Sequence, residues 1–193
     1  MQESVTPTIP QSSQWSITWN RVANQRRWMF LLIGIGSFSS VIYPHPPLVA
    51  FGAIAGSTLS PKRAFLIALS IWFMNQLYGY GLRSYPQTAE SFLWGLVMGL
   101  GMLLVTALAA LRPPFSRTTW KGHGSWMAIA VLTGFLLFES LVLSLGFLLT
   151  GSHVLTWAIL GHLLFKELIW AFALTLGYGF LARRTVRTGD ITL

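Results

Sequence analysis

The sequence predicts an all-α integral membrane protein, a single compact bundle of six transmembrane helices with both termini in the cytoplasm. Hydrophobic residues make up 53% of its 193 residues and charged residues only 9%, whereas soluble domains carry about 25% charged residues. So few polar groups cannot cover a globular surface, and lipid is the expected solvent. A regular alternation of apolar runs and basic connectors gives the number of helices and their directions.

Six apolar runs define the expected helices. A transmembrane helix needs about 20 apolar residues, and the last three runs meet that length. The second run is short and follows the prolines of YPHPP, which break a helix because proline lacks an N–H donor. We expect this second helix to be either tilted among its neighbours or re-entrant. The runs occupy residues 28–43, 47–60, 64–82, 91–111, 126–149 and 155–182.

The two ends of the chain are expected to be cytoplasmic tails around one membrane domain, residues 28–182. Residues 1–27 are polar and rich in proline and serine, and they lack the basic start and the cleavage site of a secretory signal. Residues 183–193 are expected to be unstructured. The chain has no cysteine, which excludes disulfides, thiolate nucleophiles and cysteine-bound metals.

Basic residues concentrate in alternate connectors. All but two of the 13 lysines and arginines fall in four segments expected to be cytoplasmic, as the positive-inside rule requires for six spans. The formal charge of +8 is therefore interpreted as topology and contact with anionic lipid, not nucleic-acid binding. We expect a multi-pass protein of the plasma (inner) membrane. The residues in the four segments are Arg21, Arg26, Arg27, Lys62, Arg63, Arg112, Arg117, Lys121, Arg183, Arg184 and Arg187.

Small residues recur four positions apart in several runs, which places them on one helix face. Examples are Gly52 with Gly56 and Gly95 with Gly99. Such faces let helix backbones approach closely in a membrane. Two interpretations stay open, namely ordinary packing within the bundle and a smooth face for a partner membrane subunit.

Charged residues also occur at membrane depth. Glu139 and Lys166 lie near the middle of the fifth and sixth runs, and an unpaired charge there costs about 3 kcal/mol or more. We expect these two to pair, either as a lock between helices or as part of a ligand site. Glu167 lies about 100° further round its helix and needs another partner or a proton.

Other polar side chains share the outer half of the membrane, whereas the inner half is nearly bare. Together they predict an outward-facing polar cavity, because ionisable residues inside a membrane mark functional sites. The predicted pocket residues are Asn75, Gln76, Tyr78, Arg83, Glu139, His162 and Lys166, with Tyr43, His45 and Trp72 closing it.

Several function classes are not supported by the residues. The sequence has no phosphate-binding glycine loop, no H-E-x-x-H pattern and no pair of acids at helical spacing. We therefore expect neither an enzyme nor a protein with its own metal or cofactor. Six spans without an inverted repeat or a pore-lining charge pattern are also not typical of a complete transporter or channel.

Residues 43–81, YPHPPLVAFGAIAGSTLSPKRAFLIALSIWFMNQLYGYG, resemble the first half of the substrate-binding S-components of energy-coupling factor vitamin transporters. The likeness includes the small cobalamin-specific group. It implies capture of a vitamin-like molecule from the outer face, and work with a transmembrane coupling subunit and two ATPases. In that family the protein topples within the membrane. Gly34, Ser37, Gly52 and Gly56 would form the docking surface.

Some cobalamin-binding members of that family use a cysteine as cobalt ligand, which this chain lacks. Cobalt ligation would then fall to His45, His153 or His162. The alternative is a membrane assembly factor or pigment-binding factor that transports nothing. There the polar groups would lock helices together, and His162 or His45 would ligate a haem-type or chlorophyll-type macrocycle.

Overall fold

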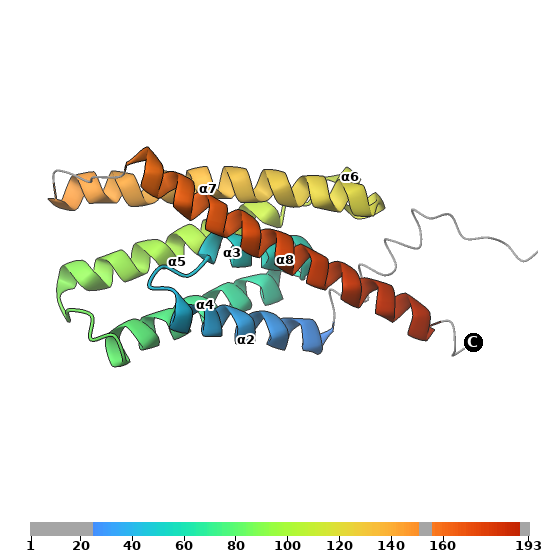
Figure 1. The fold of residues 1–193 in the computed structure, drawn as a ribbon, viewed down its shortest axis with the longest axis horizontal. Coiled ribbons are helices and arrows are strands. Elements are labelled where there is room, and N and C mark those ends of the chain that lie inside the picture. The colour runs from blue at the N-terminus through green and yellow to red at the C-terminus, as the bar shows by residue number, and fades with distance from the viewer. Residues whose placement is uncertain (1–24, 151–155, 190–193) are drawn as a thin grey trace, which may run out of the picture.

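The structure, a computed structural model, describes residues 25–150 and 156–189, and every regular element in these ranges is a helix. Figure 1 shows an elongated bundle in which most helices follow the long axis and α8 crosses the others at an angle. The prediction of an all-α chain is thereby confirmed. The helices are α2 (Arg26–Ile42), α3 (Leu48–Thr58), α4 (Pro61–Gly81), α5 (Ala89–Ala109), α6 (Pro114–Thr118), α7 (Trp120–Thr150) and α8 (Trp157–Gly189).

The outside of the bundle is apolar, as a lipid-facing surface must be. Helix α5 and the stretches Trp120–Leu149 of α7 and Trp157–Arg184 of α8 are each long and apolar enough to cross a membrane. Large side chains such as Phe147 and Phe172 are more than 60% exposed. A soluble monomer rarely leaves so much contiguous apolar surface in water. The described chain is therefore built as a helical membrane protein.

Local sequence signals set where the helices begin and end. Helix α2 ends at Ile42, just before the prolines of YPHPP. Proline is the first residue of α4, where its missing N–H is not needed. The Thr88 hydroxyl caps α5 by accepting the Ser91 N–H at 3.2 Å.

The C-terminal boundary differs from the expectation. Helix α8 continues to Gly189, so residues 183–189 are helical and the prediction of an unstructured tail from residue 183 is wrong there. The basic residues at its end cannot break the helix, because arginine is a good helix former. Residues 190–193, the tail before residue 25 and His153 lie outside the described residues.

Helix α3 is the centre of the bundle. It contacts α2, α4, α5, α7 and α8, and all of its 11 residues are buried. A helix that is apolar on all sides is typical of such a position. At 1.5 Å per residue it is only about 16 Å long, roughly half of a membrane's hydrocarbon core. Neighbouring helices thus surround this short run.

The glycines of α3 serve packing within the bundle. A Cβ added at Gly56 would strike the Thr106 carbonyl oxygen and lie 2.7 Å from the Ala109 Cβ. Helix α5 can therefore approach α3 this closely only because Gly56 has no side chain. Gly52 and Gly56 are buried, and the prediction that they dock a partner is wrong for that reason. Gly34 on α2 is exposed, and Ser37 is half-buried on the same helix.

Both ends of α3 are satisfied by charged side chains from other elements. A buried helix end is costly when its backbone groups lack partners. At the N-terminal end the Glu167 carboxylate accepts the Ala50 N–H at 2.8 Å. At the C-terminal end Arg112 donates from Nε to the Gly56 carbonyl oxygen at 2.7 Å. Each charge has the sign that the helix dipole favours at that end.

Candidate functional site

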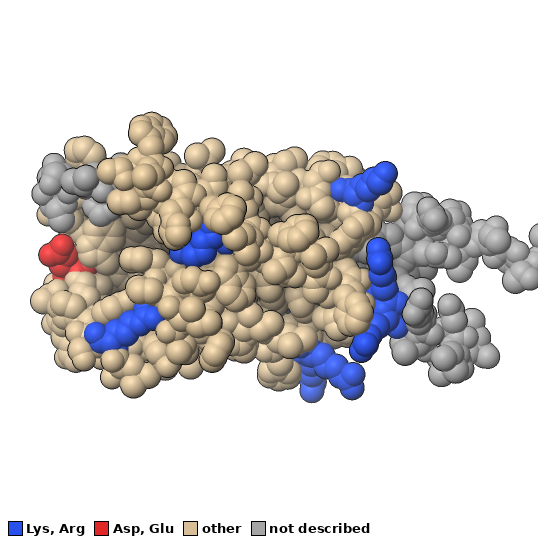
Figure 2. Space-filling view, in the orientation of Figure 1, with Lys and Arg blue, Asp and Glu red and all other residues tan. Residues whose placement is uncertain are grey.

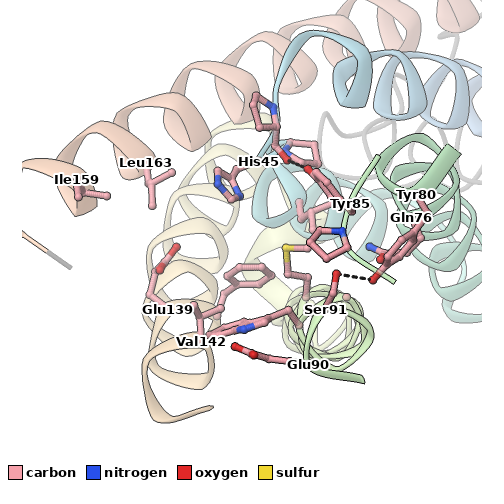
Figure 3. A pocket seen from close by; sticks show the side chains of 18 of the residues that line it. His45, Gln76, Tyr80, Tyr85, Glu90, Ser91, Glu139, Val142, Ile159 and Leu163 are labelled. Carbon is pink, nitrogen blue, oxygen red and sulfur yellow. Dashed lines mark hydrogen bonds between the residues drawn. The ribbon is translucent and has the colours of Figure 1, made fainter. Parts of the chain in front are cut away.

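A cavity of about 690 Å³ lies at the N-terminal end of α3. Its walls come from the 44–46 turn, the last turns of α4, the 85–88 segment, the first half of α5, and the facing parts of α7 and α8. The close-up in Figure 3 shows side chains from these elements converging on one space. A volume of this size is typical of sites for drug-sized ligands.

The cavity lies away from the basic end of the molecule. Lys62 and Arg63 begin α4, Arg117 and Lys121 lie where α6 leads into α7, and Arg184 lies late in α8. On the face shown in Figure 2, most blue groups gather at the end where α8 finishes. The red group visible on that face lies at the opposite end. The cavity is lined by groups of that opposite end, including Glu90 in the first turn of α5.

Two charged residues expected to pair face the same cavity from different helices. Glu139 lies about 15 Å before the apolar end of α7, and Lys166 about 14 Å after the start of α8, at 1.5 Å per residue. Counted along the two helices, the residues therefore stand at similar distances from the end of α7 and the start of α8. Both line the cavity. Figure 3 shows Glu139 extending from α7 into this space, on the side of His45 and Leu163.

Among the described residues, Glu139 and Lys166 do not form the direct ion pair that was predicted. The Lys166 ammonium instead donates to the His45 carbonyl oxygen at 2.6 Å and lies 5.8 Å from the centre of the Tyr43 ring. Its helix neighbour Glu167 is bound to the end of α3. The predicted ion pair is therefore replaced by a hydrogen bond to backbone, which ties the 43–47 loop to α8.

His45 lies in that loop and lines the cavity. Its imidazole, when neutral, offers one donor and one acceptor to a ligand.

Gln76 is the one residue of the predicted α4 cluster that lines the cavity. Its side-chain amide donates to the Asn75 side chain at 3.3 Å. Asn75 itself is only 3% exposed and does not reach the cavity. Trp72 donates to the Gly95 carbonyl oxygen at 2.7 Å and packs over Gly99. Trp72 thus joins α4 to α5, and the Gly95 and Gly99 face serves packing within the bundle.

Four other predicted residues are not part of the cavity wall, namely Tyr43, Tyr78, Arg83 and His162. Arg83 donates to the carbonyl oxygens of Tyr43 and Val41, at 3.0 and 3.1 Å, and so joins the end of α4 to the end of α2. His162 is exposed on α8. Helical spacing places it one turn from Lys166, but only Lys166 of the two lines the cavity.

Sequence reasoning missed the aromatic part of the wall. Tyr80, Tyr85, Trp94 and Phe138 all line the cavity. Tyr80 follows Gln76 by one helical turn, a signal that could have placed it on the same face. Its hydroxyl lies 3.1 Å from that of Ser91, the dashed line in Figure 3. This contact holds the end of α4 against the start of α5.

Glu167 was considered for pairing but not as part of the site, and it too lines the cavity. Within the described residues no group of three or more histidine, cysteine or acidic side chains could hold a metal ion. The cavity offers a ligand carboxyl groups, one lysine ammonium, an imidazole, an amide and aromatic faces.

Comparisons with protein-family models, with curated proteins and with solved structures found no match to this chain. The fold and the cavity themselves define the class, which is a helical membrane protein with a polar and aromatic cavity at one end of its bundle.

Proposed function

We propose that this chain is the substrate-binding membrane subunit of an uptake transporter for a vitamin-like micronutrient, of the kind found in energy-coupling factor systems. The observation that carries the proposal is the cavity of about 690 Å³, whose polar groups Gln76 and Glu139 face aromatic walls. A mostly apolar pocket with a few convergent polar groups is the usual form of a small-molecule site. Binding fixes orientation through the polar groups and gains affinity from the aromatic rings.

In this proposal the chain passes the membrane six times, through α2, α3, α4, α5, α7 and α8. The basic ends of α4, α7 and α8 then lie in the cytoplasm, in agreement with the positive-inside rule. The cavity accordingly opens toward the exterior. Uptake requires this orientation, because the ligand must be captured before it enters the cell.

The short helix α3 fits six passes because protein surrounds it. Non-helical backbone is tolerated at membrane depth only where it is buried in protein or lines a cavity. The loop before α3 meets that condition, since His45 lines the cavity and its carbonyl oxygen accepts the hydrogen bond of Lys166. The 43–47 loop and α3 together complete one pass.

The proposed transporter includes a transmembrane coupling subunit and ATPases as partners. The docking surface is restricted to α2, because Gly34 is exposed while Gly52 and Gly56 are buried under α5. A cavity of this volume suits a drug-sized vitamin. Cobalamin is larger than that class, and for this reason we place it behind smaller vitamins as the ligand.

A ligand panel tests the proposal. The purified chain in detergent is mixed with each water-soluble vitamin, and the midpoint of thermal unfolding is measured. One vitamin should raise the midpoint, because a ligand that binds only the folded state stabilises it by about 2.7 kcal/mol at 100 times Kd.

The matched variants are Trp94→Leu in the cavity and Phe172→Leu on the lipid-facing surface. The first should abolish the ligand-induced shift and the second should keep it. A coloured protein whose absorbance is lost with His45→Ala would favour the pigment-binding alternative instead. If no vitamin shifts the midpoint and cells expressing the chain accumulate none, the proposal is wrong.

A further inference from the structure

Three acidic side chains and one lysine line the cavity among the described residues, and the acid at membrane depth without a hydrogen-bonded partner is Glu139. This side chain is half-buried and lines the cavity. It makes no hydrogen bond or ion pair within residues 25–150 and 156–189. A carboxylate at membrane depth is costly without a partner of opposite charge. A positive group supplied by a ligand would remove that cost.

The basic side chain that lines the cavity with Glu139 already makes a hydrogen bond to the backbone. Lys166 is the only lysine or arginine among the described residues that line the cavity. Its ammonium donates to the His45 carbonyl oxygen, and it lies next in sequence to Glu167. Lys166 acts electrostatically on both Glu139 and Glu167, so one lysine serves two acids of the wall.

The other acidic residue of the wall has a local explanation. Glu90 is exposed in the first turn of α5, where a carboxylate is favoured by the positive end of the helix dipole. It adds to the negative potential of the cavity without requiring a ligand. Among the described residues that line the cavity, Lys166 is the only lysine or arginine beside these acids.

The aromatic wall suits the same kind of ligand. Rings of Tyr80, Tyr85, Trp94 and Phe138 line the space beside Glu139. The faces of aromatic rings attract cations and stack against flat ligand rings. Tyr80 and Tyr85 meet edge to face at 6.0 Å between ring centres, so their positions are fixed by each other.

We infer that the cavity takes a flat organic cation, a heteroaromatic or aryl ammonium compound whose positive centre pairs with Glu139 and whose ring packs against Trp94 and Phe138. This inference rests on the proposed function and specifies its substrate class. It excludes anionic ligands as the preferred class, although Lys166 lines the same space.

Three probes that share a quinoline ring and differ in charge test the inference. N-methylquinolinium is a cation, 4-methylquinoline is neutral at pH 7.5, and quinoline-4-carboxylate is an anion. Binding of each to the purified full chain is measured by calorimetric titration. The cation should bind about tenfold or more tightly than its neutral counterpart, because it alone forms a charge pair in a site of low dielectric.

Two isosteric variants assign the effect. Glu139→Gln keeps the size of the side chain and should remove the preference for the cation, while the neutral probe binds as before. Lys166→Met removes the opposing charge and should strengthen binding of the cation. Trp94→Leu should weaken the binding of the cation and the binding of the neutral probe to the same extent. Unfolding midpoints without ligand show whether each variant is folded.

The outcomes distinguish failure of the cation inference from failure of the proposed function. If the anion binds best and Lys166→Met abolishes its binding, the cavity binds ligands as proposed but the inference of a cation is overturned. A cation preference that survives in Glu139→Gln overturns it as well. If no probe binds and no vitamin shifts the unfolding midpoint, the proposed function falls together with the inference.

Discussion

The Glu167 carboxylate, on α8, accepts the backbone N–H of Ala50 at 2.8 Å, 117 residues away in the chain. Glu167 is only 5% exposed, and Ala50 lies in the first turn of α3. This hydrogen bond fixes α8 to the helix at the centre of the bundle. Lys166 also ties α8 to the 43–47 loop. Helix α8 therefore positions the part of the cavity wall that the loop and the start of α3 form.

Truncation of Glu167 should destabilise the protein more than neutralisation does. Glu167→Ala leaves the Ala50 N–H without its acceptor, which costs about 1–3 kcal/mol. Glu167→Gln keeps an acceptor oxygen and should cost less. Leu168→Ala, a truncation at an exposed neighbouring position, is the control. Thermal unfolding in detergent measures all three, and equal loss in Ala and Gln variants would contradict the capping role.

Arg112 should be needed at the other end of α3. It donates two hydrogen bonds to the Gly56 carbonyl oxygen, so Arg112→Met removes both while keeping much of the side-chain volume. We expect a loss of about 2 kcal/mol or more, because a buried carbonyl loses a charged donor. Arg117→Met, on an exposed basic residue of α6, should leave the unfolding midpoint unchanged.

The glycines of α3 and α2 should respond oppositely to alanine. Gly56→Ala forces α5 away from α3, since the new methyl group meets backbone atoms, and should cost at least about 1–3 kcal/mol. Gly34→Ala meets no atom within 4 Å and should be neutral or slightly stabilising. Unfolding midpoints of the two variants give the comparison. A tolerated Gly56→Ala would mean that α3 and α5 are packed less closely than described.

Composition and periodicity predicted the helices well because lipid imposes simple rules on length and hydrophobicity. Helix ends followed from the prolines near α3 and α4. The burial of Gly52 and Gly56 was not predictable, since small residues look alike whether they face a neighbouring helix or a partner. Only the position of α3 at the centre of the bundle decides between the two.

The site was predicted in part for a related reason. Depth in the membrane can be counted along the sequence, and Glu139 and Lys166, which this count places at a similar depth, both line the cavity. Which side chains of a helix reach a cavity cannot be counted in this way, and His162 does not line it although Lys166, one turn along, does. Trp94 and Tyr85 were missed because aromatic residues near a membrane interface are usual whether or not they line a cavity.

Accessibility of single cysteines tests the outward-facing cavity most directly, and the chain has no native cysteine to interfere. A membrane-impermeant maleimide is added to intact cells expressing Gln76→Cys, Glu139→Cys, Ala130→Cys or Lys121→Cys. Cysteines at positions 76 and 139 should react from outside, the fully buried position 130 should not react, and position 121 should react only after the membrane is opened. Labelling at 121 from outside, or protection of 76 and 139 until the membrane is opened, would contradict the account.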